Sequence, residues 1–218
     1  DTTTQLWFRS LIDLSTHPIP GTEGGGVPRV SPDGRRLAFL QSSKVKVIPI
    51  EGGQPRVLAE IRDPDALQWV SPTRLFAMDD DGNTLKWLDA EAGQTSESAV
   101  PYCIEAQWLA DRQRLLCGGG GDKAGSLVDP VTRTRVPLVT PSEGRADTAS
   151  EPLLGSAFRV VDGRHLVYMS LDGDLRATTF DAASGRAGRS VTVVPGVRRE
   201  AYSGGGQFVL TPRGMLVY

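Results

Sequence analysis

The sequence predicts an all-β fold built from many short strands, and three observations lead to this prediction. Glycine and proline are abundant, with 25 and 15 copies among 218 residues, and they recur between short apolar runs instead of forming one tract. Such residues mark the turns of a chain that changes direction often. No segment shows the sustained periodicity of a long helix. Apolar residues make up 39% of the chain, which is enough for the core of one large β domain.

A recurring unit, a tight turn followed by a short apolar strand, decides among the all-β architectures. The clearest copy runs from Val30 to Phe39 and reads VSPDGRRLAF. Its proline fixes φ, its aspartate can accept hydrogen bonds from the following backbone, and its glycine supplies a positive φ. The leucine after the turn returns about every 40 to 50 residues, the period of a four-stranded propeller blade. These leucines are Leu37, Leu75, Leu115, Leu166 and Leu216. The repeat therefore predicts a β-propeller of four-stranded antiparallel blades.

Each period also holds a third and a fourth expected strand. The third strands are expected at residues 6–8, 45–48, 84–88, 126–128 and 175–180, and the fourth strands at 55–58, 95–100, 135–139 and 190–194. The chain opens at a third strand and stops at a second one. We therefore expect one domain over residues 1–218, with half blade 1–22, blades at about 23–61, 62–102, 103–142 and 143–197, and half blade 198–218.

The two expected half blades predict how the ring is completed. Paired with each other, they would form a fifth blade and close the ring, which removes exposed sheet edges. The alternatives are a piece of a longer propeller, or an oligomer in which half blades of different copies complete each other.

Several segments resemble known families. The unit at residues 30–39 resembles the repeat of TolB-like (WD-like) propellers. Segments 5–11, 18–24, 193–198, 204–208 and 214–218 resemble the propellers that follow the kinase domain and membrane helix of some bacterial serine/threonine protein kinases. Two copies depart from the repeat, with Thr73 alone or Asp111 and Arg112 in place of Asp33 and Gly34. The resemblance implies an extracytoplasmic (periplasmic or cell-surface) binding or scaffolding role. It brings no catalytic residues and no cofactor.

The charge balance limits the classes of partner. Basic and acidic residues number 24 and 26, so no large field of one sign favours nucleic acid or an anionic membrane surface. No stretch reaches the roughly 18 apolar residues that span a bilayer. We expect no nucleic-acid partner and no direct membrane insertion of this segment.

Polar loops at the blade ends are the candidate binding regions, for an unknown protein or small ligand. The densest acidic cluster is expected between the second and third strands of its blade, where adjacent oxygens could bind a hard cation such as calcium. A terminal glutamate is missing, so a polar hairpin turn is the plainer interpretation, and we expect no metal. The second region is the glycine-rich loop 118–123, and the third is the insertion 143–151. The candidate residues are Asp79, Asp80, Asp81, Asn83, Asp122 and Lys123.

The residue types that support catalysis are scarce, and we expect no catalytic residues. His17 and His165 are the only histidines, too few for a three-histidine metal site, and no Gly-x-Ser-x-Gly motif occurs. Cys103 and Cys117 fall near the start of a first strand and the end of its partner. Folding about Ala110 would place them roughly opposite, so a cross-strand disulfide is conceivable, and reduced, packed cysteines are the default.

Large aromatic residues recur at matching places in the repeat, and packing between blades is their expected role. An aromatic sugar-binding platform is the alternative. The residues are Trp69, Trp108, Phe39, Phe76, Phe158, Tyr168 and Phe180.

Three functions are compatible with these features. The first is a non-catalytic binding or scaffolding propeller, the sensor module of a larger bacterial envelope protein such as a receptor-type serine/threonine kinase. The second is the accessory propeller of a prolyl-oligopeptidase-type hydrolase. The third is a free-standing TolB-like periplasmic scaffold.

Overall fold

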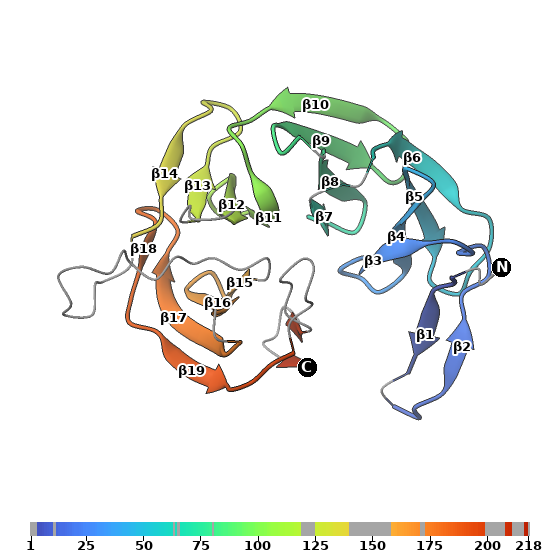
Figure 1. Ribbon diagram of the computed structural model, residues 1–218. Coiled ribbons are helices and arrows are strands. Elements are labelled where there is room, and N and C mark those ends of the chain that lie inside the picture. Colours follow the sequence, from blue (N-terminus) through green and yellow to red (C-terminus); the bar gives the residue numbers. More distant parts are fainter. Residues whose placement is uncertain are drawn as a thin grey trace. The chain divides into compact units, whose positions relative to one another are not determined.

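The computed structural model describes residues 4–10, 12–62, 64, 66–79, 81–118, 125–139, 158–170, 173–198, 208–210 and 216–217. Every regular element in these ranges is a β-strand, and within each sheet neighbouring strands run antiparallel (Figure 1). In the same ranges there is no helix with the length and apolar character required to cross a membrane. The chain divides into two compact units, Asp1–Ser98 and Ala99–Tyr218, which are described in turn.

The first unit holds a two-stranded hairpin and two four-stranded sheets. The hairpin pairs β1 (Trp7–Arg9) with β2 (Thr16–Pro18). Blade 1 follows as β3 (Gly26–Val30), β4 (Arg36–Gln41), β5 (Lys44–Pro49) and β6 (Arg56–Glu60). Blade 2 is β7 (Ala66–Trp69), β8 (Arg74–Met78), β9 (Thr84–Asp89) and β10 (Thr95–Ala99). In both blades the spatial order of the strands follows their order along the chain.

The second unit holds a four-stranded sheet, a five-stranded sheet and a short hairpin. Blade 3 is β11 (Ile104–Leu109), β12 (Arg114–Gly118), β13 (Ser126–Val128) and β14 (Arg135–Pro137). Blade 4 is β15 (Phe158–Val161), β16 (His165–Met169), β17 (Leu175–Asp181), β18 (Arg186–Ala187) and β19 (Val191–Val194). A last hairpin pairs β20 (Val209–Leu210) with β21 (Leu216–Val217).

The all-β class and its four-stranded antiparallel sheets are confirmed. The fourth strand expected at 190–194 in the last blade is present as β19, and β18, which was not predicted, also pairs with β17. The seven residues of β17 are long enough for both short strands to share its outer edge. The expected half blades are each a two-stranded sheet. Their pairing into a fifth blade, and the domain bounds, stay predictions.

The repeated turn is closed by its own polar side chains, as the VSPDGRR motif predicts. Ser31 Oγ donates to Asp33 Oδ1 at 2.5 Å, and Asp33 Oδ1 also accepts from Arg35 N. These hydrogen bonds, chiefly the one from Ser31, hold the pKa of Asp33 below its usual value. In blade 2, where Thr73 replaces the Asp-Gly pair, Ser71 Oγ instead accepts from the backbone N–H groups of the turn.

The turn between third and fourth strands uses the same chemistry. Asp89 Oδ1 accepts from Glu91 N at 2.8 Å and from Ala92 N at 2.7 Å. Asp129 accepts in the same way from Val131 N and Thr132 N in blade 3, and Asp181 accepts from Ser184 Oγ and Ala183 N in blade 4. These hydrogen bonds lower the pKa of all three carboxyl groups, and for Asp181 the bond from Ser184 is the main cause. We call the end of each blade that carries both kinds of turn the turn end. The opposite end, with the second-to-third and fourth-to-first connections, is the loop end.

First strands of neighbouring blades are joined by side chains. In unit 1, Arg29 Nε donates to Leu67 O at 3.0 Å, and Trp69 Nε1 donates to Arg29 O at 2.8 Å. In unit 2, Gln107 makes two bonds to one residue: its Nε2 donates to Val160 O at 3.2 Å, and its Oε1 accepts from Val160 N at 2.7 Å. A glutamine amide can therefore substitute for a strand partner on the inner edge of a sheet.

The apolar cores lie between these neighbouring blades. One buried cluster combines residues of blades 1 and 2, including Val45, Leu58 and Trp69, and a second combines Leu109 and Leu127 of blade 3 with Phe158 of blade 4. The expected burial of the aromatic residues is confirmed for all but one, since Trp108 is half-buried. The buried ones are Trp69, Phe39, Phe76, Phe158, Tyr168 and Phe180.

A close backbone approach attaches the first hairpin to blade 1. Gly52 has a φ of +94°, and a Cβ atom there would lie 2.7 Å from Pro20 Cδ. Only glycine combines this φ with this spacing.

The pair of hydrogen bonds between Gln107 and Val160, which we call the Gln107 clamp, predicts a stability change. Replacing Gln107 with alanine leaves the partly buried N–H and C=O of Val160 without this partner, which should lower the free energy of unfolding by about 1 kcal/mol. Urea unfolding followed by circular dichroism measures the change. Gln94→Ala, at an exposed position, is the matched control and should change it by less than about 0.5 kcal/mol. Equal effects of the two variants would show that the clamp contributes nothing.

Candidate functional site

The acidic cluster lies in the loop between β8 and β9, as expected, but Asp79 already has a partner. Lys86 Nζ on β9 lies 2.9 Å from Asp79 Oδ2 and 3.5 Å from Glu97 Oε1 on β10. The side chains of Lys86 and Asp79 are only 15% and 22% exposed. Asp79 therefore tethers the loop to the sheet, and its carboxylate points to an ammonium group.

The tip of the same loop is an internally bonded hairpin turn. Asp81 Oδ1 accepts from Asn83 N at 2.7 Å and from Thr84 N at 3.0 Å, and Asn83 Nδ2 donates to Asp81 O. Gly82 supplies the positive φ, at +64°. Asp81 and Asn83 remain exposed, so both can meet a partner. This arrangement matches the polar-turn interpretation.

The remaining candidate residues of the loops are only partly described. Asp80, Asp122, Lys123 and the insertion 143–151 lie outside the described residues. Gly118, which opens the glycine-rich loop, is the last residue of β12. Across the described ranges, no group of three or more His, Cys, Asp or Glu side chains is placed to hold a metal ion.

The two histidines occupy separate surface positions. His17 on β2 stacks on Phe8 of β1, with ring centroids 5.2 Å apart. His165 Nδ1 lies 2.9 Å from Asp162 Oδ2 in the blade 4 turn, where it lowers the pKa of that carboxyl group. Each histidine thus stabilises a local hairpin contact.

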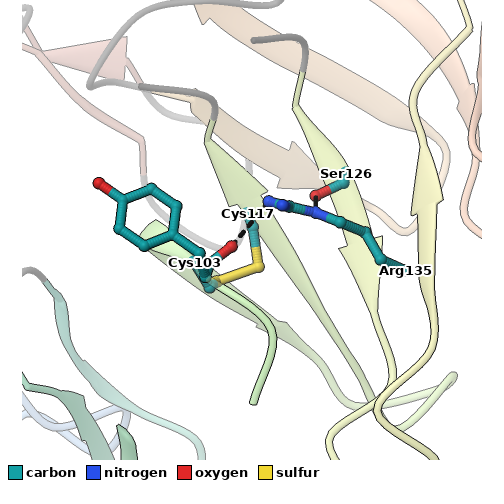
Figure 2. Close-up of a disulfide and its surroundings, with 5 residues drawn as sticks. Cys103, Cys117, Ser126 and Arg135 are labelled. Atoms are coloured by element: carbon teal, nitrogen blue, oxygen red, sulfur yellow. Dashed lines mark hydrogen bonds between the residues drawn. A yellow bond between two sulfur atoms is a disulfide. The ribbon is translucent and has the colours of Figure 1, made fainter. Parts of the chain in front are cut away.

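Cys103 and Cys117 form a disulfide, so the default expectation of reduced cysteines is wrong (Figure 2). Cys103 directly precedes β11 and Cys117 lies in β12, with their Cα atoms 5.1 Å apart. Both residues are fully buried. As predicted from the hairpin about Ala110, the antiparallel pairing of β11 and β12 brings them together.

An arginine holds the backbone beside this disulfide. Arg135 on β14 donates from Nε to Ser126 Oγ and from Nη2 to Tyr102 O, both at 2.7 Å. Figure 2 shows its guanidinium group lying across the sheet, next to the two sulfur atoms. Residues 100–103, which we call the junction, are therefore fixed by a covalent bond at Cys103 and a charge-assisted hydrogen bond at Tyr102. Sequence reasoning missed Arg135, because nothing local pairs it with the junction.

In blade 1 an aromatic ring occupies the place that the disulfide occupies in blade 3. Its first two strands have the same register and bulge, between Gly26 and Arg29, that blade 3 has between Ile104 and Gln107. In that register Gly25 corresponds to Cys103, and Phe39 to Cys117. A Cβ atom on Gly25 would lie 2.9 Å from the Phe39 ring, so the ring fills the place that the disulfide fills in blade 3. Aligning the two repeats in sequence matches Cys103 with Gly25 and Cys117 with Phe39. This match would have favoured the disulfide.

Comparisons with known proteins show the fold. No protein-family model and no curated protein matches the chain. A structure of a nidogen/laminin complex matches with a TM-score of 0.58 and 15% identity, over 86% of this chain and 72% of that one. A TolB from Agrobacterium tumefaciens matches with a TM-score of 0.57 and 17% identity, over 86% and 73%. The β-propeller domain of the Trilobed protease from Pyrococcus furiosus matches with 0.55 and 14%, over 97% and 67%. The β-propeller class predicted from the repeat is confirmed, and identities this low show the fold alone.

The Lys86–Asp79 ion pair predicts a pH dependence. The hydrogen bond to Asp79 is the main cause that raises the pKa of Lys86 above its usual 10.5. The stabilisation is therefore complete below that value and disappears as the pH rises through the folded-state pKa. At neutral pH the free energy of unfolding of the wild type should exceed that of Lys86→Met by about 1 kcal/mol.

Urea unfolding of wild type and Lys86→Met between neutral and strongly alkaline pH measures this difference. The gap between the two proteins should close above pH 10.5. Lys44→Met, which removes a more exposed pair with Glu60, is the control and should show a smaller gap. A gap that stays constant with pH would contradict the assignment.

Proposed function

We propose that this chain is a non-catalytic binding or scaffolding propeller that works outside the cytoplasm, as the sensor or protein-interaction module of a larger bacterial envelope protein. The observation that carries the proposal is the difference between the two ends of the blades. Connections at the turn end are uniformly short. Connections at the loop end differ more in length, from residues 42–43 between β4 and β5 to the stretch 138–157 between β14 and β15, of which the structure describes only residues 138–139. Variable loops on a constant scaffold are the usual location of binding residues.

The polar groups at the loop end of blade 2 are compatible with this role. Aspartates at both ends accept hydrogen bonds within their own turns, Asp33, Asp89, Asp129 and Asp181 at the turn end and Asp81 at the loop end. At the loop end of blade 2, Asp81 and Asn83 are exposed beyond a tether formed by Asp79 and Lys86. A held loop with exposed polar tips can bind a partner without a large ordering cost.

The disulfide supports a location outside the cytoplasm. Disulfides persist in oxidising compartments such as the periplasm and the cell surface, and they are rare in the cytosol. Both cysteines of the chain are joined to each other. The likeness to a TolB and to a structure of a nidogen/laminin complex agrees with a binding role for the fold.

A receptor-type serine/threonine kinase is the parent protein that we propose, on the resemblance of the terminal segments. The complete reading frame tests it. A kinase domain followed by one membrane helix on the amino-terminal side is the expected result. A secretion signal without further domains would support a free-standing periplasmic scaffold and overturn the kinase proposal.

A hydrolase accessory propeller is the second candidate, favoured by the likeness to the propeller domain of the Trilobed protease over 97% of this chain. The same reading frame separates the candidates, since this function requires a hydrolase domain in the chain. Such a domain would replace the sensor proposal.

The candidate loop predicts a specific binding defect. Asp81→Asn keeps the turn, because an amide oxygen can still accept from Asn83 N and Thr84 N, but it removes the exposed charge. Asp33→Asn makes the same change in a turn of the turn end and is the matched control. In affinity capture from an envelope extract of the producing cells, Asp81→Asn should lower recovery of bound proteins by about tenfold, a loss of about 1.4 kcal/mol.

The control variant should recover the same proteins as wild type. Equal recovery by all three proteins would remove this loop from the binding surface. Equal loss with both variants would show a general effect of charge.

A further inference from the structure

The junction before β11 is held by the disulfide, by hydrogen bonds and by the burial of Val100. Cys103 is bonded to Cys117, Tyr102 O accepts from Arg135, and Ile104 pairs with Gly118. Beyond Ile104 the register shifts, and regular pairing resumes only at Gln107 with Leu116. The bulge separates the junction from the rest of β11, so the junction can detach while the remainder of the strand stays paired.

The bulge also contains an unfavourable backbone conformation. Glu105 has a φ of +50°, in the left-handed region that favours glycine. Such a conformation is unfavourable for a residue other than glycine and persists only where the surrounding contacts hold it. The disulfide at Cys103 is one of these contacts.

Blade 1 shows which contacts replace the disulfide where it is absent. The same bulge there has Val27 at a φ of +51°. The Phe39 ring packs under Gly25. Gln41 donates from Nε2 to Glu23 O, and its Oε1 accepts from Lys46 Nζ. Blade 3 has no ring at the place of Phe39, because Cys117 stands there. At this place its junction relies on the disulfide where blade 1 relies on the ring.

From this geometry we propose that Cys103–Cys117 is a redox latch: its reduction opens the junction at the loop end of blade 3 while the sheet stays folded. The co-reactant is a small or protein dithiol. One thiolate attacks a cysteine sulfur, the S–S bond breaks, and the released cysteine takes a proton. The second thiol then resolves the mixed disulfide, so the dithiol is oxidised and Cys103 and Cys117 become two thiols.

Because the cysteines are buried, their reduction depends on the conformation of the junction. Both cysteines are 0% exposed, so a reductant reaches the sulfur atoms only when the junction opens. Tyr102, 41% exposed, is the side chain whose position changes with the redox state. The latch would therefore link the redox poise of the surroundings to the loop end of blade 3. This inference does not depend on the proposed partner.

Hydrogen–deuterium exchange of the oxidised protein, and of protein reduced with dithiothreitol and alkylated with iodoacetamide, tests the latch. In the reduced protein, amides of residues 100–106 should exchange about tenfold faster or more. The paired strands β3 and β4 of blade 1, and β15 and β16 of blade 4, should be unchanged.

Two variants complete the design. Cys103→Gly with Cys117→Phe copies blade 1 and should show slow exchange at the junction with or without dithiothreitol. Cys103→Ser with Cys117→Ser should match the reduced protein. Unchanged exchange after reduction would overturn the proposal, as would equal acceleration in all strands of blades 3 and 4, which marks a purely structural disulfide. Failure of dithiothreitol to reduce the folded protein would overturn it too.

Discussion

The fold depends on how the unpaired backbone groups on the free edge of each blade's first strand find hydrogen-bond partners. The first strand of a blade has a hydrogen-bonded neighbour on one side only, and its other backbone groups need partners. Side chains supply them: Gln107 pairs with both polar atoms of the Val160 backbone, and Arg29 and Trp69 exchange bonds with the backbones of β7 and β3. These contacts align blade 1 with blade 2 and blade 3 with blade 4, and an apolar cluster lies between the blades of each pair. Packing and polar satisfaction thus specify the same arrangement.

The two ends of a blade follow different rules. Turns at the turn end are short and bonded within themselves, through Asp33, Asp89 and their counterparts. Connections at the loop end vary in length and are fixed one by one, through the Lys86–Asp79 ion pair in blade 2 and through Arg135 and a disulfide in blade 3. Evolution can change such loops without disturbing the sheet, which is why we assign binding to this end.

Blades 1 and 3 show how one backbone accepts different chemistry. Their first strands share a register, a bulge and a positive φ, at Val27 and Glu105. In one blade an aromatic ring packs under a glycine, and in the other a disulfide takes the same place. A packed ring cannot respond to a reductant, whereas a disulfide can. Replacing the aromatic ring by a disulfide would therefore make this part of the scaffold sensitive to reduction.

The sequence by itself determined the strands, the turns and the repeat, because their causes are local: Ser31, Asp33 and Gly34 close a turn within a few residues of chain. Only the tertiary structure decided which distant groups meet. Asp79 has the residue type of a cation ligand, yet Lys86 from the next strand occupies it. The place of Arg135, the sharing of the β17 edge by β18 and β19, and the bond between Cys103 and Cys117 also depend on strand register. Register follows from the packing of whole sheets, and no short segment encodes it alone.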